Sequence, residues 1–116
     1  MRSMNKASRL SGIQRLTLRL LLAIEQRRTE PVPVIDLFGM VEKNRTSSTY
    51  QSNYRKSCHT LAERGLLALH RTPAFRPAFL LTDAGRLVAI DIEAEAQELE
   101  RLQAAQQRSG AGNHAQ

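Results

Sequence analysis

The stretch LAERGLLALHRTPAFRPAFLLTDAGR, residues 61–86, changes its structural pattern several times within a short length. Gly65 ends a helical pattern, because glycine adopts the left-handed conformation that most residues resist. Residues 66–70 then read as a strand, residues 71–77 as a loop bounded by prolines, and residues 78–81 as a returning strand. The stretch therefore predicts a helix end followed by a β-hairpin with a rigid, basic tip.

Downstream of the hairpin, the sequence predicts one long helix. Thr82 is a favourable helix cap, and Asp83 suits the positive end of the helix dipole. The helix is expected to run to about Gln107. We therefore expect a C-terminal dimerisation helix over residues 83–108 and a disordered tail over residues 109–116.

The long helix carries a short apolar seam whose positions alternate in steps of four and three, with Glu95 in the one place where an apolar residue should stand. Its members are Val88, Ile92, Leu99 and Leu102. The seam could pair with its symmetry mate in a dimer, or fold back on the first helix as ordinary core. Dimerisation is favoured, because the helix is longer than the core of so small a domain could cover.

Upstream of residue 61, the sequence begins with a flexible basic arm over residues 1–7. A helix capped by Ser8 or Ser11 is then expected to run to about Arg28. The prolines at 31 and 33 predict a short extended linker or strand, because proline lacks an N–H and biases its predecessor towards extended geometry. The apolar spacing within residues 34–44 predicts a second helix.

The first helix is apolar on two faces. One stripe at helical period consists of Ile13, Leu16, Leu20 and Ile24. Leu18 and Leu22 lie on the opposite side, where either a partner subunit or the chain's own C-terminal helix could cover them. We assign these two leucines to the dimer interface.

A third helix, capped by Thr46, Ser47 or Ser48, is expected to run to Arg64, and its two sides differ sharply. The packing side carries Tyr50, Tyr54, Ser57, Cys58 and Leu61, whereas the polar side carries Ser52, Arg55, Lys56 and His59, with Thr49 and Gln51 at its flanks. Cys58 is expected to be a buried packing residue and not a nucleophile, because its neighbour His59 points away from it.

Charge is distributed unevenly along the chain. Residues 1–81 hold fourteen Lys and Arg against five Asp and Glu, whereas residues 82–116 hold three against six. A basic domain followed by an acidic helix suggests that the domain binds a polyanion. The alternative is a solvent-exposed surface whose excess of positive charge has no function.

The single cysteine and the absence of zinc-type spacing favour a reducing, cytoplasmic setting. No apolar run is long enough to cross a membrane.

The order of elements predicts a mainly α protein with a small β-hairpin wing: a winged helix-turn-helix domain over residues 8–82, with a long C-terminal helix. Two motifs carry a family resemblance. Residues 61–67, LAERGLL, resemble the end of the recognition helix in bacterial MarR-like and PadR-like regulators, and residues 81–86, LTDAGR, resemble the Leu-Thr-x-x-Gly signature that closes their wing. The acidic C-terminal helix is nearer to the PadR-like arrangement, and the wing lacks the Asp that MarR-like wings place ahead of their Arg.

The resemblance implies a homodimeric transcription regulator, such as a repressor, whose third helix enters the major groove of double-stranded DNA while the wing contacts the flanking groove. Arg55 and Gln51, supported by Ser52, are expected to reach base edges, because Arg matches guanine and Gln matches adenine. The remaining DNA-binding residues are assigned as follows: Ser48, Lys56 and His59 to phosphates, Thr49 to the flank of the helix, Arg76 to the minor groove and Arg71 to the flank of the site. The alternative for these side chains is a purely structural or solubilising role, with Arg55 paired to nearby acids.

Other function classes stay open. A non-specific DNA-coating protein of plasmid, phage or nucleoid type would need the same basic helix and wing, whereas a winged-helix protein-interaction module would not. We expect no enzyme, because no paired carboxylates, activated nucleophile or phosphate-binding glycine loop is present. No cofactor and no metal site is expected, and an effector, whether small molecule or protein, is not identified. The expected location is the cytoplasm, on the nucleoid.

Overall fold

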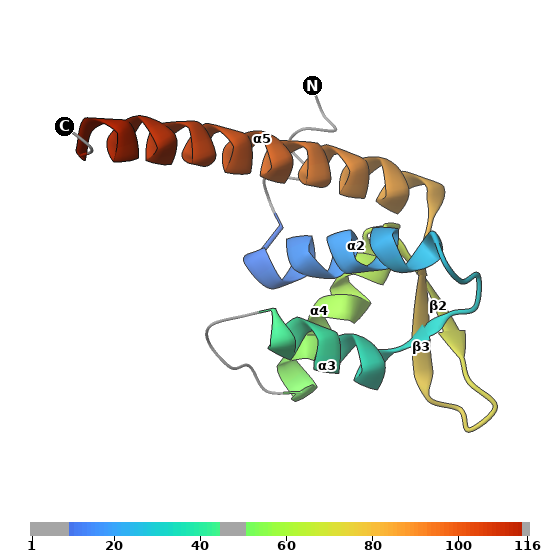
Figure 1. The fold of residues 1–116 in the computed structure, drawn as a ribbon. Coiled ribbons are helices and arrows are strands. Elements are labelled where there is room, and N and C mark those ends of the chain that lie inside the picture. Colours follow the sequence, from blue (N-terminus) through green and yellow to red (C-terminus); the bar gives the residue numbers. More distant parts are fainter. Residues whose placement is uncertain (1–9, 45–50, 115–116) are drawn as a thin grey trace.

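The computed structural model describes residues 10–44 and 51–114, and from residue 108 onward only the backbone. The described elements are, in order, α2 (Gly12–Glu25), β1 (Val32–Pro33), α3 (Val34–Lys43), α4 (Gln51–Glu63), β2 (Leu67–Arg71), β3 (Pro77–Leu81) and α5 (Asp83–His114). The strands form an antiparallel sheet in the order β1-β3-β2, and the hairpin of β2 and β3 projects from the body as a wing (Figure 1). The predicted fold class, a mainly α winged helix-turn-helix with a long C-terminal helix, is confirmed.

The start of α2 is fixed by a capping box, which decides between the two predicted caps in favour of Ser11. The backbone N–H of Gln14 donates to Ser11 Oγ at 3.1 Å, and the N–H of Ser11 donates to Gln14 Oε1 at 3.0 Å. The helix ends at Glu25, short of the predicted Arg28. The caps predicted for α4, at positions 46–48, lie outside the described residues.

The two motifs that carry the family resemblance contact each other where the wing closes. Gly65 adopts a φ of 81°, as its predicted role requires. The Thr82 hydroxyl donates to the Gly65 carbonyl at 2.6 Å, and its Oγ1 accepts the N–H of Gly85 at 3.0 Å. A Cβ on Gly85 would lie 1.9 Å from the Leu66 carbonyl oxygen. The Thr-x-x-Gly spacing therefore caps α5 and lets it pack against the backbone at the end of α4.

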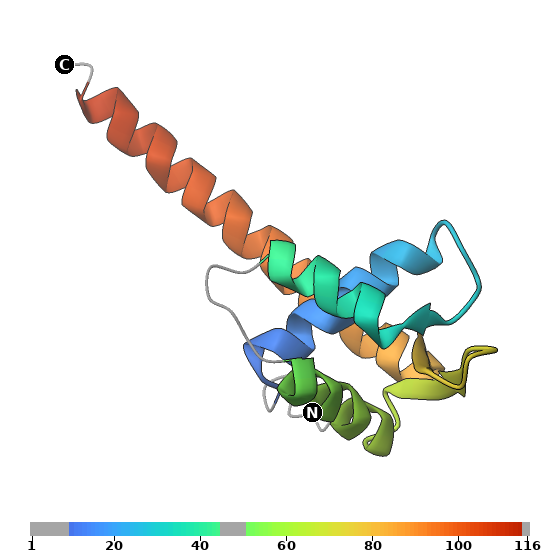
Figure 2. The same ribbon diagram turned by 90° about the horizontal axis from the view of Figure 1, so that it is seen from below.

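Helix α2 lies between α5 on one side and the α3 and α4 layer on the other (Figures 1 and 2). This sandwiched position explains its two apolar faces. The core below α2 includes the fully buried side chains Leu18, Leu37, Val41, Tyr54, Leu61 and Phe79. A single cluster extends from these residues into the first turns of α5.

The structure separates the six predicted dimer residues into two groups. Four belong to the chain's own core or pack against it: Leu18, Val88 and Ile92 are buried and Leu22 is half-buried. Packing within one chain therefore accounts for the apolar character of these four, and their place in a dimer interface stays a prediction. Leu99 and Leu102 remain 56% and 52% exposed.

Ion pairs join α2 to α5 along their contact, which we call the α2–α5 seam. The pairs are Arg15 with Glu95 at 2.8 Å, Arg19 with Glu93 at 2.8 Å and Glu25 with Arg86 at 2.7 Å. The hydrogen bond from Arg19 holds the pKa of Glu93 below its usual value. The hydrogen bonds to Glu25 and then to Asp83 raise the pKa of Arg86. The seam thus fixes α5 on the body with matched charges.

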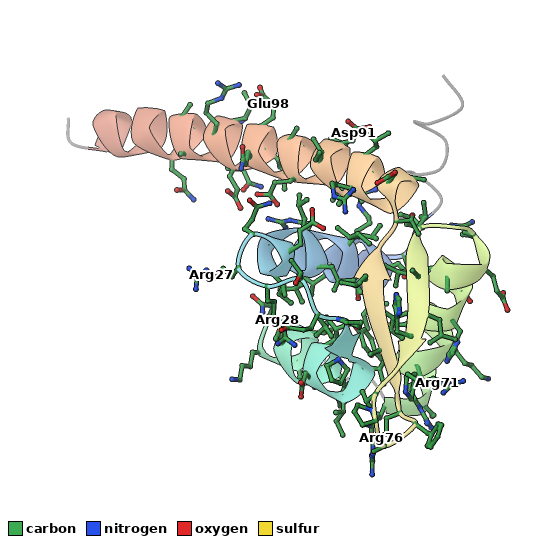
Figure 3. All side chains as sticks on the ribbon, turned by 90° about the vertical axis from the view of Figure 1, so that its right-hand side faces the viewer. Arg27, Arg28, Arg71, Arg76, Asp91 and Glu98 are labelled. Carbon is green, nitrogen blue, oxygen red and sulfur yellow. The ribbon has the colours of Figure 1, made fainter. Side chains whose placement is uncertain are left out.

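Beyond the seam, α5 extends well past α2, which makes the molecule elongated, with extents of 62 × 33 × 26 Å (Figures 1 and 2). Its end at His114 lies past the predicted end near Gln107, so residues 109–114 of the predicted tail are helical. The outer side of α5 carries acidic groups such as Asp91 and Glu98 (Figure 3). No helix in the described part is long and apolar enough to span a membrane.

Candidate nucleic-acid interface

The position of α4 is set by its buried side, where Tyr54, Cys58 and Leu61 pack as predicted, whereas Tyr50 lies outside the described residues. Tyr54 and Cys58 are fully buried. The Tyr54 hydroxyl and Thr17 Oγ1 of α2 are hydrogen-bonded at 2.9 Å, and the Thr17 hydroxyl lies 2.8 Å from the Ile13 carbonyl, to which it also bonds. A buried hydrogen bond of this kind fixes both the rotation of α4 and its distance from α2. The opposite side of the helix is thereby turned outward.

The buried polar groups of α4 stay neutral. Burial raises the pKa of the Cys58 thiol to about 11, with a smaller opposing effect from the hydrogen bond to Tyr54. Burial also raises the pKa of Tyr54, and the neighbouring Cys58 adds to that rise. Since the thiolate is the nucleophilic form of cysteine, Cys58 is suited to packing and not to chemistry.

The outward side of α4 and the wing border one cleft of about 550 Å³. Ser52, Arg55 and Lys56 are exposed along α4, and Arg71 approaches from the end of β2 (Figure 3). His59 also lines the cleft but is half-buried, because the edge of its ring packs on Phe79 with 5.6 Å between ring centroids.

A second, smaller cleft of about 150 Å³ joins the N-terminal end of α4 to the wing tip. Gln51 and Arg55 line it from the helix, and Phe75 and Arg76 line it from the wing. Arg55 borders both clefts. The structure therefore brings together the predicted site residues from α4 with Arg71 and Arg76, which are remote from them in sequence.

The cations of this surface lack an acidic partner in the described part of the chain. Among the residues that the structure describes, no ion pair involves Arg55, Lys56, Arg71 or Arg76. One acidic side chain, Glu63 in the last turn of α4, lines the larger cleft. We call the surface formed by Gln51, Ser52, Arg55, Lys56, His59, Arg71 and Arg76 the α4–wing face. Unpaired cations around a cleft attract an anionic partner.

Two predicted residues lie outside the described part of the chain, and one residue of the site was not predicted. Ser48, predicted to contact a phosphate, and Thr49, predicted at the flank of the helix, are the two that lie outside it. Phe75 borders the cleft at the wing tip with a positive φ of 62° and is not among the predicted site residues. The dipeptide Thr72-Pro73, a typical start of a β-turn, was the available signal for this tip. In the described part of the chain, no cluster of His, Cys, Asp and Glu could hold a metal ion.

Comparisons by sequence give no match, either to a protein-family model or to a curated protein. Comparisons by structure give strong matches. MepR, a transcription regulator of the Staphylococcus aureus multidrug efflux pump MepA, superposes with a TM-score of 0.67 at 17% identity, covering 90% of this chain and 76% of MepR. The adhesin competence repressor AdcR of Streptococcus pyogenes gives 0.67 at 17% identity, covering 87% of this chain and 68% of AdcR.

MepR has also been crystallised in complex with DNA, and that structure matches with a TM-score of 0.64 at 15% identity, over 96% of this chain and 86% of MepR. These proteins are MarR-family winged-helix regulators. The predicted resemblance to MarR-like regulators is therefore confirmed at the level of the fold.

Proposed function

We propose that this chain is a homodimeric transcription regulator, such as a repressor, that binds specific sites on double-stranded DNA. In this proposal α4 enters the major groove and the wing contacts the flanking minor groove. The observation that carries the proposal is the α4–wing face, because four unpaired cations from distant parts of the sequence converge there. MepR, a neighbour in fold, has been crystallised with DNA, which supports a DNA-binding role. A protein with this role works in the cytoplasm, on the nucleoid.

The residues of the α4–wing face divide by the kind of contact their chemistry suits. Arg55 and Gln51 are exposed near the N-terminal end of α4, where a helix in the major groove presents side chains to base edges. Lys56 and Arg71 suit phosphates. Arg76, on the wing, suits the narrow and electronegative minor groove.

The remaining assignments concern His59, Ser52, Ser48 and Thr49. His59 is proposed as a phosphate contact, although its packing on Phe79 restricts it to an approach from the cleft. Ser52 is proposed as support for the base contacts. Ser48 and Thr49 keep their proposed role next to α4.

Dimerisation is proposed through the part of α5 that extends past the body. Leu99 and Leu102 continue the apolar stripe that begins at Val88 and Ile92, but both stay more than half exposed in the described structure. A second copy of the same helix would cover both leucines, and an isolated helix of this length gains most of its stability from such packing. The dimer would present two α4–wing faces to two half-sites.

The dimer proposal is tested by the mass of the protein in solution. Light scattering on the wild-type protein is expected to give twice the chain mass, and Leu99→Glu with Leu102→Glu is expected to give the mass of one chain. Ile90→Glu is the matched control, because Ile90 is also exposed but lies on the opposite side of α5 from Leu99. A wild-type monomer, or a double variant that stays dimeric, would remove this interface from the proposal.

The DNA proposal is tested by recovering fragments of sheared genomic DNA at near-physiological salt and sequencing them. The wild-type protein is expected to enrich a short, two-fold symmetric motif, and Arg55→Ala or Arg76→Ala to lower that enrichment. Arg19→Ala is the matched control, because it also removes an arginine, but one paired with Glu93 in the α2–α5 seam. Retention of DNA without a motif would favour a DNA-coating role, and no retention would favour a protein-interaction module.

A further inference from the structure

The tip of the wing is a tightly closed turn built around Thr72. The N–H of Thr72 donates to the Arg76 carbonyl at 2.9 Å, and the Thr72 carbonyl accepts the N–H of Phe75 at 2.8 Å. The Thr72 hydroxyl oxygen accepts the N–H of Arg76 at 3.1 Å. Pro73 and Pro77 restrict the backbone on both sides. The tip is therefore held in one conformation.

Within this turn, Phe75 has the backbone conformation that suits it least. It is the one non-glycine residue with a positive φ, 62°, in the described part of the chain. Three-residue hairpin loops usually place glycine at this left-handed position, because a Cβ crowds the backbone there. Strained backbone of this kind clusters at binding sites.

The Phe75 ring is 81% exposed, more than any other large apolar side chain described. It therefore receives almost no burial within its own chain, although it sits on a strained backbone. The ring borders the cleft that holds Arg55 and Arg76, so it lies among the cations of the α4–wing face. An exposed aromatic ring on a rigid mount, flanked by unpaired arginines, matches the apolar wedges that enter the minor groove of DNA.

We propose that Phe75 is a wedge that enters the minor groove, partly unstacks one base step and bends the duplex. This inference rests on the proposed function. Arg76 enters the same groove beside the ring, while Arg71 holds a phosphate and the ring meets the bases. The exposed ring is then buried in the complex, and the strained backbone is what directs it at the groove.

The test uses the full chain and two fluorescently end-labelled duplexes of about 30 base pairs at low salt, identical except for one central mismatch that is already easier to unstack. The wild-type protein is expected to bind the mismatched duplex about fivefold more tightly than the matched one. It is also expected to bring the labelled ends closer, as a bend of about 20–90° requires. Phe75→Ala should lose both the preference and most of the bend.

Two further variants separate the wedge from a structural role of the ring. Phe75→Gly relieves the backbone and is expected to raise the thermal midpoint while still losing the mismatch preference and the bend. Ala74→Ser, its neighbour in the turn, should behave as the wild type. The wedge alone would be overturned if the wild type bound both duplexes with equal affinity and did not bend them. It would also be overturned if Phe75→Ala kept the mismatch preference and the bend. No wild-type binding to either duplex would overturn the proposed function together with the wedge.

Discussion

Arginine is used in opposite ways in two regions of this molecule. In the α2–α5 seam, Arg15, Arg19 and Arg86 each lie within 2.8 Å of a carboxylate on the neighbouring helix. On the α4–wing face, Arg55 and Arg76 form no ion pair with any described residue. Paired arginines fix a joint within the fold, whereas unpaired ones keep their charge for an outside partner. Changes in the seam should therefore affect stability alone, and changes on the face should affect binding alone.

The largest effect on stability is expected in the first turn of α5. Gly85→Ala places a Cβ 1.9 Å from the Leu66 carbonyl oxygen, a backbone atom that cannot move aside cheaply. Overpacking of this kind is expected to lower the free energy of unfolding by about 3 kcal/mol, measured by chemical denaturation. Gly39→Ala, at a helical glycine with open space around it, should instead raise stability by about 0.5–1 kcal/mol. Equal stability of Gly85→Ala and the wild type would contradict this account of the joint.

The next effect concerns the anchoring of α4. Tyr54→Phe removes the buried hydroxyl that is hydrogen-bonded to Thr17 and is expected to lower the free energy of unfolding by about 1 kcal/mol. Because the substitution also loosens the helix that carries Arg55, it should weaken DNA binding slightly, which makes it the one variant that links the two regions. Denaturation and duplex binding measured on one preparation check both effects. A variant as stable as the wild type would show that the hydrogen bond does not fix α4.

A smaller effect is expected from reversing one ion pair of the seam. Arg19→Glu faces Glu93 with a like charge and should lower the free energy of unfolding by about 0.5–1 kcal/mol, since both side chains are a third exposed. Combining it with Glu93→Arg should restore most of this loss in a double-mutant cycle. DNA affinity should not change in any of the three variants. A drop in affinity would mean that the seam and the α4–wing face are not independent.

The smallest effect is a pH dependence of the seam. Arg19 lowers the pKa of Glu93, so this pair stabilises the fold at pH values above the ordinary glutamate pKa of 4.5. The contribution is lost as the pH falls below that value and through the lowered pKa of the folded state. Acid titration of the unfolding free energy should therefore show a shallower loss in Arg19→Ala than in the wild type. Identical acid dependence in the two proteins would mean that the pair contributes nothing.

The sequence predicted the elements whose boundaries depend on local chemistry. The prolines before α3, the left-handed Gly65 and the Thr82 cap each act within a few residues, so their patterns identify them. The polar and apolar sides of α4 were also predictable, because helical period alone separates Arg55 from Tyr54.

Other features depend on contacts that sequence patterns do not encode. Val88 and Ile92 follow a heptad pattern, but the same spacing serves packing on α2 within one chain and packing between two chains. The ion pairs of the seam join residues far apart in sequence, so no local motif marks them. The positive φ of Phe75 opposes its residue preference, and only the closed turn around Thr72 imposes it.

The salt dependence of binding to a mixed-sequence duplex of about 30 base pairs tests the central claim most directly, because each phosphate contact releases counterions. The account predicts that the logarithm of the binding constant falls linearly with the logarithm of salt concentration for the wild type. Lys56→Ala or Arg71→Ala should make the slope shallower by about 0.9 for each phosphate contact removed. Arg19→Ala should leave the slope unchanged. A flat wild-type line, or equal slopes for all variants, would contradict the claim that the unpaired cations of the α4–wing face bind DNA.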